Sequence, residues 1–219
     1  MDYQTAHTRL LLPSGYTFSP ASKSVTVSGA NVTGVNFTGS PSGGGITFIQ
    51  GNNGFTGSSA SSLTVAYSKA QTAGDTNFVV VYAGNNTRWT VPPISSVSDN
   101  ITGKYTLVGQ VGGVDVSAYI YLFSGIKSAS AGADKVTVRM AVTVIGLGIS
   151  VFEYSGLPSS PLDGMVQKSA NWSANASITP VTTTNAKDLI FAVVVGDSNQ
   201  QFTAGARYTL RPGMEPGPA

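Results

Sequence analysis

The stretch 134–154, DKVTVRMAVTVIGLGISVFEY, contains the clearest strand pattern of the chain. Its first half alternates with a period of two. One face carries apolar side chains, namely Val136, Val138, Met140, Val142 and Val144. The other face carries Thr137, Arg139, Ala141 and Thr143. If residues 145–147 form a three-residue hairpin loop, the register places Arg139 opposite Glu153. Glu153 then becomes the outward half of a cross-strand ion pair, and Phe152 and Tyr154 join the valine face.

The rest of the chain follows the same pattern of short strands. Apolar segments rich in Val, Ile, Thr, Tyr and Phe are bounded by Gly, Asn, Ser or Pro, and no stretch has a convincing helical period. Strands are expected near residues 16–19, 23–28, 33–38, 46–50, 62–67, 77–83, 86–91, 104–110, 114–123, 135–144, 147–154, 164–169, 176–182, 188–195 and 206–211. Because no long helical segments separate them, the pattern predicts an all-β fold of antiparallel sheets, arranged as a sandwich or barrel.

The composition indicates a polar but weakly charged surface. Charged residues make up 10% of the 219 residues, against about 25% in typical soluble domains, so Ser, Thr, Asn and Gly must supply the polar positions. The net charge of +2 comes from scattered basic residues, which argues against a nucleic-acid partner. The absence of cysteine excludes disulfides and thiolate sites. Such a chain is typical of exported bacterial proteins, so we expect it to be secreted or at the cell surface.

Neither the start of the chain nor its apolar segments indicate a membrane segment. The opening MDYQTAHTRLLLP lacks the charge and apolar pattern of a signal peptide, so an export signal would lie outside this sequence. The apolar run LIFAVVV at 189–195 is too short to span a bilayer, and no membrane partner is expected. Residues 1–12 lack a strand pattern, and we expect them to be poorly ordered or held by a partner chain.

The N-terminal part is expected to be a separate, incomplete module. Residues 40–45, SPSGGG, are predicted to form a linker, because three glycines and a proline fit poorly inside a sheet. Before it, GYTFSPASKSVTVSGANVTGVNFTG at 15–39 resembles the last strands of the carboxypeptidase-regulatory-like or prealbumin-like modules of large secreted bacterial proteins. This resemblance implies that residues 1–39 are a tail and a truncated Ig-like or prealbumin-like β module, which needs a neighbour to complete its core.

Residues 46–211 resemble the jelly-roll modules of the same class of secreted proteins, which are similar to carbohydrate-binding and lectin-like sandwiches. The segments that carry the resemblance are, in order, SSLTVAY, AGDTNFVVVYAG, VSDNITGKYT, FEYSGLPSSPLDG and ARYTL. It implies an antiparallel jelly roll followed by a disordered tail at 212–219, and a non-catalytic carbohydrate-binding or adhesion function within a larger protein. The strand edges left free by both modules also predict a homo-oligomer.

The segment VDVSAYIYLF at 114–123 supplies the candidate ligand-binding residues. Its alternation predicts one core face, consisting of Val114, Val116, Ala118, Ile120 and Leu122. The other face carries Asp115, Ser117, Tyr119, Tyr121 and Phe123, and this row of rings resembles the platform on which jelly-roll modules stack sugars. We therefore expect Tyr119 and Tyr121 to be solvent-accessible and to bind a polysaccharide or cell-surface glycan, with Trp89 and Trp172 as further candidates. The alternative is that this face packs under loops or against the N-terminal segment.

A hydrolase is the alternative function. Glu153 between two aromatic residues has the setting of a general acid, and a glycosidase would use Asp163 as its second carboxylate. The block Gly-Asp-Ser ending at Ser198 resembles the nucleophile block of the GDSL hydrolases. That family needs an Asp-x-x-His base downstream, which is missing here, and the single histidine, His7, lies near the other end of the chain. We therefore expect no catalytic site.

Turns rich in Asp and Asn are the candidates for a cofactor site. Asp75, Asp99 and Asp197 lie in such turns, and loops at one end of a sandwich could bring their oxygens together around a calcium ion. Aspartate and asparagine also stabilise turns without any metal. We favour the second interpretation, and no cofactor is expected.

Overall fold

A computed structural model describes residues 16–19, 36, 38–41, 45–84, 90–113, 115–168, 179–184, 188–195 and 203–211. The chain divides into two compact units, Met1–Gly45 and Ile46–Ala219. In the first unit, β1 (Tyr16–Ser19) pairs antiparallel with β2 (Thr38–Pro41). The strand expected at 16–19 is confirmed. The predicted linker is wrong at its start, because residues 40 and 41 belong to β2, where a proline is tolerated at the strand end. The strand expected at 23–28 lies outside the described residues.

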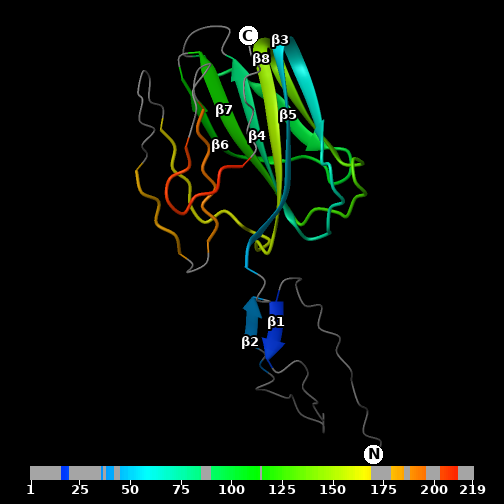
Figure 1. The fold of residues 1–219 in the computed structure, drawn as a ribbon, viewed down its shortest axis with the longest axis vertical. Helices are drawn as coiled ribbons and strands as arrows, with labels where there is room; N and C mark the ends of the chain where they lie inside the picture. The colour runs from blue at the N-terminus through cyan, green and yellow to red at the C-terminus, as the bar shows by residue number, and fades with distance from the viewer. Residues whose placement is uncertain are drawn as a thin grey trace, which may run out of the picture. The chain divides into compact units, whose positions relative to one another are not determined.

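The second unit contains one six-stranded antiparallel sheet (Figure 1). Its strands are β3 (Thr47–Ala66), β4 (Thr76–Gly84), β5 (Ile94–Asp99), β6 (Thr106–Gly112), β7 (Val116–Ser124) and β8 (Lys135–Ser155). The order is β3-β8-β4-β7-β6, and β5 also pairs with β8. The described ranges contain no helix, and so none that is long and apolar enough to cross a membrane. The predicted antiparallel all-β class is confirmed.

β8 is one continuous strand where a hairpin was expected. Its first part pairs with β5, its second part pairs with β4, and both parts pair with β3. The predicted loop at 145–147 is therefore wrong. Gly146 has a φ of 78°. Before it the core-facing residues have even numbers, and after it they have odd numbers. Val138 and Val144 precede this change, and Leu147 and Ile149 follow it, all in one apolar cluster.

The change of face at Gly146 overturns the predicted ion pair. A shift of one residue moves every following side chain to the other face of a strand. Glu153 is consequently on the core side and is 0% exposed, opposite Gln50 of β3 and Asn77 of β4. Arg139 is exposed and lies opposite Ser62 and Ser96. The predicted pairing of Arg139 with Glu153 is therefore wrong.

Other strand boundaries also differ from the prediction. β3 is a single strand across the two segments expected at 46–50 and 62–67, because the Gly- and Ser-rich stretch between them pairs with β8 through three register shifts. The strand expected at 77–83 is confirmed as β4, whereas β5 was not predicted. Of the last four expected strands, the described parts form no strand of the sheet, and the segment expected at 206–211 begins in a turn in which Arg207 has a φ of 72°.

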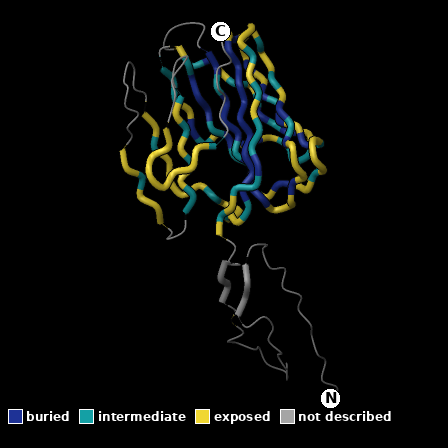
Figure 2. Tube along the Cα trace, in the orientation of Figure 1, coloured by how far each residue is buried: buried dark blue, intermediate teal, exposed yellow. Residues whose placement is uncertain are grey.

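Two apolar clusters lie on opposite faces of the central strands, and Figure 2 shows the buried residues following these strands. The larger cluster draws side chains from β3, β4, β5, β7 and β8. The smaller one consists of Val80, Phe152 and Tyr154, packed against the segment 188–195. Phe191 of that segment stacks on Phe78 with ring centroids 4.7 Å apart. The run LIFAVVV therefore covers the sheet instead of extending it.

Gly84, at the end of β4, leaves no room for a side chain. A Cβ at this position would lie 1.9 Å from the carbonyl oxygen of Ile145. Because the obstacle is the backbone of β8, Gly84→Ala is expected to lower the free energy of unfolding by about 3 kcal/mol, measured by urea denaturation. Gly57→Ala is the control, since its Cβ would have its nearest neighbour at 3.8 Å. Equal stability of the two variants would contradict this description of the β4–β8 contact.

Candidate functional site

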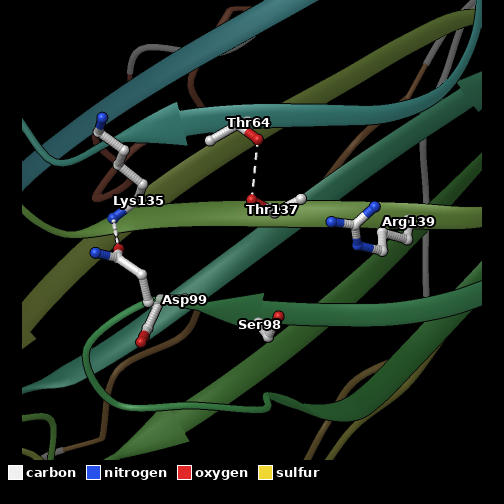
Figure 3. A pocket seen from close by; sticks show the side chains of 7 residues that line it. Thr64, Ser98, Asp99, Lys135, Thr137 and Arg139 are labelled. Atoms are coloured by element: carbon white, nitrogen blue, oxygen red, sulfur yellow. Dashed lines mark hydrogen bonds between the residues drawn. The ribbon is translucent and has the colours of Figure 1, made fainter.

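The outward face of β3, β8 and β5 carries a shallow groove of about 320 Å³ (Figure 3). Seven residues line it: Thr64, Ser98, Asp99, Asn100, Lys135, Thr137 and Arg139. The sheet register brings them together, because Thr64 and Ser98 both lie opposite Thr137. In Figure 3 the side chains of Lys135, Thr137 and Arg139 follow one another along β8.

Hydrogen bonds fix the floor of this groove. The hydroxyls of Thr64 and Thr137 are 2.9 Å apart and bonded to each other. The backbone N–H of Lys135 donates to Asn100 Oδ1 at 2.6 Å, and Ser62 Oγ donates to the carbonyl of Val138 at 3.0 Å. The alternate residues Val136 and Val138 are fully buried beneath the floor. The polar face is therefore held in place before any ligand arrives.

The two cations of the groove have no acidic partner. Lys135 and Arg139 are exposed, and neither side chain forms a hydrogen bond or ion pair within the described part of the chain. The carboxyl of Asp99 is already occupied: Oδ1 accepts the N–H groups of residues 101–103, and Oδ2 accepts the Tyr105 hydroxyl at 2.9 Å. The two cations outnumber this one acid, so the lining of the groove keeps a net positive charge.

A second set of polar side chains is buried at the end of the larger apolar cluster. Glu153 accepts a hydrogen bond from Gln50 Nε2 at 2.5 Å and another from the N–H of Thr72 at 3.3 Å. It also shares a hydrogen bond with Asp75. Gln50 in turn makes two hydrogen bonds with the backbone of Lys69: its Nε2 donates to the carbonyl, and its Oε1 accepts from the N–H. Glu153 therefore anchors the connection between β3 and β4 and has no exposed surface for a substrate.

The buried polar network continues to the groove. Gln71 Nε2 donates to Asn77 Oδ1 at 3.1 Å, and Asn77 Nδ2 donates to the Tyr105 hydroxyl at 3.0 Å. That hydroxyl donates to the carboxyl of Asp99, a buried residue that also lines the groove. The network therefore joins the β3–β4 connection to the turn after β5, and it supports one wall of the groove.

Burial raises the pKa values of two acids in this region, Asp75 and Asp134. The pKa of Asp75 rises to about 6, first because of desolvation and then because of the nearby Glu153. Asp134 is 1% exposed, and its carboxyl oxygens have no hydrogen-bond partner among the described residues. Its pKa rises to about 7 through desolvation and then through Asp99. In the folded protein both acids therefore keep their protons up to a higher pH than an ordinary aspartate does.

Tyr119 and Tyr121 do not form the expected exposed platform. They are 2% and 7% exposed and belong to the larger apolar cluster, so the prediction that they are solvent-accessible is wrong. The Tyr119 hydroxyl donates to the carbonyl of Pro92, and burial raises the pKa of Tyr119 to about 12. β7 does alternate, but the predicted faces are reversed. Asp115 is exposed just before the strand.

A second cavity of about 470 Å³ lies between β5 and β6 and includes Tyr121 in its wall. Its two aromatic residues, Tyr105 and Tyr121, are both almost fully buried. Neither presents a free ring face of the kind that stacks on a sugar. This cavity therefore offers no aromatic platform either.

Among the described residues, the remaining predicted ones do not assemble into a catalytic or metal site. Asp163 is exposed, and its carboxyl accepts the N–H and the hydroxyl of Thr184 at 2.6 and 2.7 Å. These hydrogen bonds lower the pKa of Asp163, and none of its hydrogen-bond partners is shared with Glu153. In the described ranges no three acidic or histidine side chains are grouped to hold a metal. Asp99 stabilises its own turn, whereas Asp75 lies against Glu153.

Four predicted residues lie outside the described part of the chain: Trp89, Trp172, Asp197 and Ser198. The predictions made for them stay predictions. Sequence reasoning also missed the groove as a site, although it placed Thr137 and Arg139 correctly on the outward face of their strand. The missing information was which strands flank them, because β3 and β5 are distant in sequence.

No protein-family model matches the chain, and neither curated proteins nor solved structures show a significant similarity to it. Fold and site together define the class: an antiparallel all-β protein with a preformed, positively charged polar groove on its sheet.

Proposed function

We propose that this chain is a non-catalytic carbohydrate-binding or adhesion module of a larger secreted bacterial protein. The observation that carries the proposal is the groove on β3, β8 and β5, which is open to solvent and has a hydrogen-bonded floor. Hydroxyl, amide, ammonium and guanidinium groups are the side-chain groups that hydrogen-bond to sugar hydroxyls and acidic groups. The ligand is a polysaccharide or cell-surface glycan.

A jelly-roll sandwich is the arrangement that we propose for the second unit. The larger apolar cluster supports it, because Val97 and Val138 from the β5 part of the sheet share that cluster with Val81 and Tyr119 from the β4–β7 part. A common core of this kind is expected when two parts of a sheet face each other. Free strand edges, which favour a homo-oligomer, stay part of the proposal.

The absence of a catalytic arrangement in the groove favours binding over hydrolysis. Among the seven lining residues there is no histidine, and the carboxyl of Asp99 is occupied by the turn that it stabilises. Glu153 is enclosed by Gln50 and the β3–β4 connection. Chromogenic ester and glycoside substrates should therefore show no turnover above buffer. Turnover that Glu153→Gln or Ser198→Ala abolishes would favour the hydrolase.

The groove hydroxyls provide a direct test of glycan binding. The double change Thr64→Val and Thr137→Val keeps the β-branched shape but removes both hydroxyls. We expect it to weaken binding of a glycan identified on an array about tenfold, since each hydrogen bond is worth about 0.5–1.5 kcal/mol. Affinity is measured by isothermal titration calorimetry. Thr143→Val, an exposed change on β8 beyond the groove, is the control, and equal affinities of the two variants would place the glycan elsewhere.

A further inference from the structure

We propose that the glycan bound in the groove is acidic, and that Lys135 and Arg139 hold its carboxylate or sulfate groups. This inference rests on the proposed function and adds the chemical class of the ligand. It is carried by three features of the groove: the spacing of its cations, the absence of aromatic side chains in its lining, and the excess of cations over acids among its lining residues.

The two cations stand at opposite ends of the groove floor. Lys135 and Arg139 are four residues apart on one outward face of β8, and Thr137 lies between them. A strand rises about 3.3 Å per residue, which separates their Cα atoms by about 13 Å. A small anion brings both cations together only if the two side chains bend toward each other, whereas an extended oligosaccharide with several acidic groups can contact each of them along the strand. The spacing therefore favours a polymer over a single sugar.

The lining favours charge over ring stacking as the source of affinity. None of its seven residues is aromatic, so a neutral sugar would find no ring face to stack on. The hydroxyls of Thr64 and Thr137, which are bonded to each other, contribute hydrogen bonds to a neutral and an acidic glycan alike. Attraction between the two cations and an acidic group is the contribution that distinguishes an acidic glycan from a neutral one.

The neighbours of the two cations leave their charge available. Arg139 lies opposite Ser62 on β3 and Ser96 on β5, and Lys135 lies opposite Ala66. All three neighbours are uncharged, so the register offers no cross-strand ion pair. The one acid in the lining, Asp99, is held by its own turn and by the Tyr105 hydroxyl. With two cations against one acid, the lining keeps a net positive charge that attracts an incoming acidic group.

Matched polymers test this inference. Dextran sulfate and dextran share one backbone and differ in charge, and polygalacturonate supplies carboxylates in place of sulfates. We expect at least one acidic polymer to bind at low salt while dextran does not, and the binding to weaken when NaCl is raised to about 0.5 M. Lys135→Ala and Arg139→Ala should each reduce affinity about threefold, and the double variant about tenfold. Lys168→Ala, an exposed lysine beside the edge of β6, should leave it unchanged.

The outcomes separate this inference from the proposed function. If dextran binds as well as dextran sulfate and the threonine double variant weakens both, the glycan function stands and the acidic ligand is wrong. An acidic polymer whose affinity is the same for the double cation variant and for Lys168→Ala would also overturn the inference. So would a DNA oligonucleotide that binds as tightly as the acidic glycans. If none of the polymers binds, the inference and the choice of this groove fail together.

Discussion

Replacing Glu153 with alanine is expected to lower the free energy of unfolding by about 3–5 kcal/mol. The side chain is 0% exposed and accepts hydrogen bonds from Gln50 and from the N–H of Thr72. Alanine would remove the acceptor that the buried Gln50 amide and the N–H of Thr72 share, and it would open a cavity beside Asp75. The loss is measured as a shift of the urea denaturation midpoint. A variant as stable as the wild type would contradict the buried position of this residue.

Glu153→Gln is the matched control, because the amide keeps an oxygen that can accept from Thr72 and removes the negative charge next to Asp75. The raised pKa of Asp75, about 6, means that the folded protein binds this proton more tightly than the unfolded chain does. The resulting stability is present below about pH 4 and is lost as the pH rises through 6. In Glu153→Gln the pKa of Asp75 should fall, so its stability should depend less on pH in this window. An unchanged pH profile would show that Glu153 does not act on Asp75.

Replacing Tyr119 with alanine is expected to cost about 3–5 kcal/mol of stability, as large-to-small changes of buried aromatic residues do. The ring is 2% exposed within the larger apolar cluster. Tyr119→Phe keeps the ring and loses only the hydrogen bond to Pro92, so it should cost about 1 kcal/mol. Thermal unfolding measures both changes. A Tyr119→Ala variant that unfolds like the wild type but no longer binds glycan would support the original prediction of an exposed, glycan-binding tyrosine face.

Local patterns predicted several strands because their signals are local. The segment 77–83 is almost entirely apolar and lies in the sheet as β4, and the alternation over 135–144 correctly assigned Val136 and Val138 inward and Arg139 outward. These assignments depend only on the period of two. By contrast, β5 (ISSVSD) has a weak apolar pattern, and its place in the sheet depends on pairing with the distant β8.

The hairpin prediction was wrong because a glycine with a positive φ occurs both in tight turns and at irregularities within a continuous strand. Gly-x-Gly at 146–148 resembles a turn, yet Gly146 uses its positive φ to continue β8 with a change of face. Nothing local distinguishes a turn from such an irregularity. The choice depends on β3 and β4, which pair with β8 on both sides. The predicted outward position of Glu153 depended on the hairpin register, so it was wrong as well.

The prediction that Tyr119 and Tyr121 are solvent-accessible was wrong for a related reason. Alternation shows which residues of β7 share a face, but not which face meets the larger core. Both faces of this strand are at least partly covered, since Ile120 is half-buried on the side opposite Tyr119. When a sheet is covered on both sides, apolar side chains on one face no longer identify the core. Tyr119 and Tyr121 therefore lie in the core, with their ring faces against other side chains.

Backbone amide mapping by NMR tests the central claim most directly. The ¹⁵N-labelled protein would be titrated with oligogalacturonate, and the amide shift changes would be followed residue by residue. We expect the largest changes around Thr64 of β3, Ser98 of β5 and the stretch from Lys135 to Arg139 of β8, the three strands that form the groove. Changes concentrated instead at Leu107 and Tyr121, around the cavity between β5 and β6, would contradict the assignment of this groove as the glycan-binding surface.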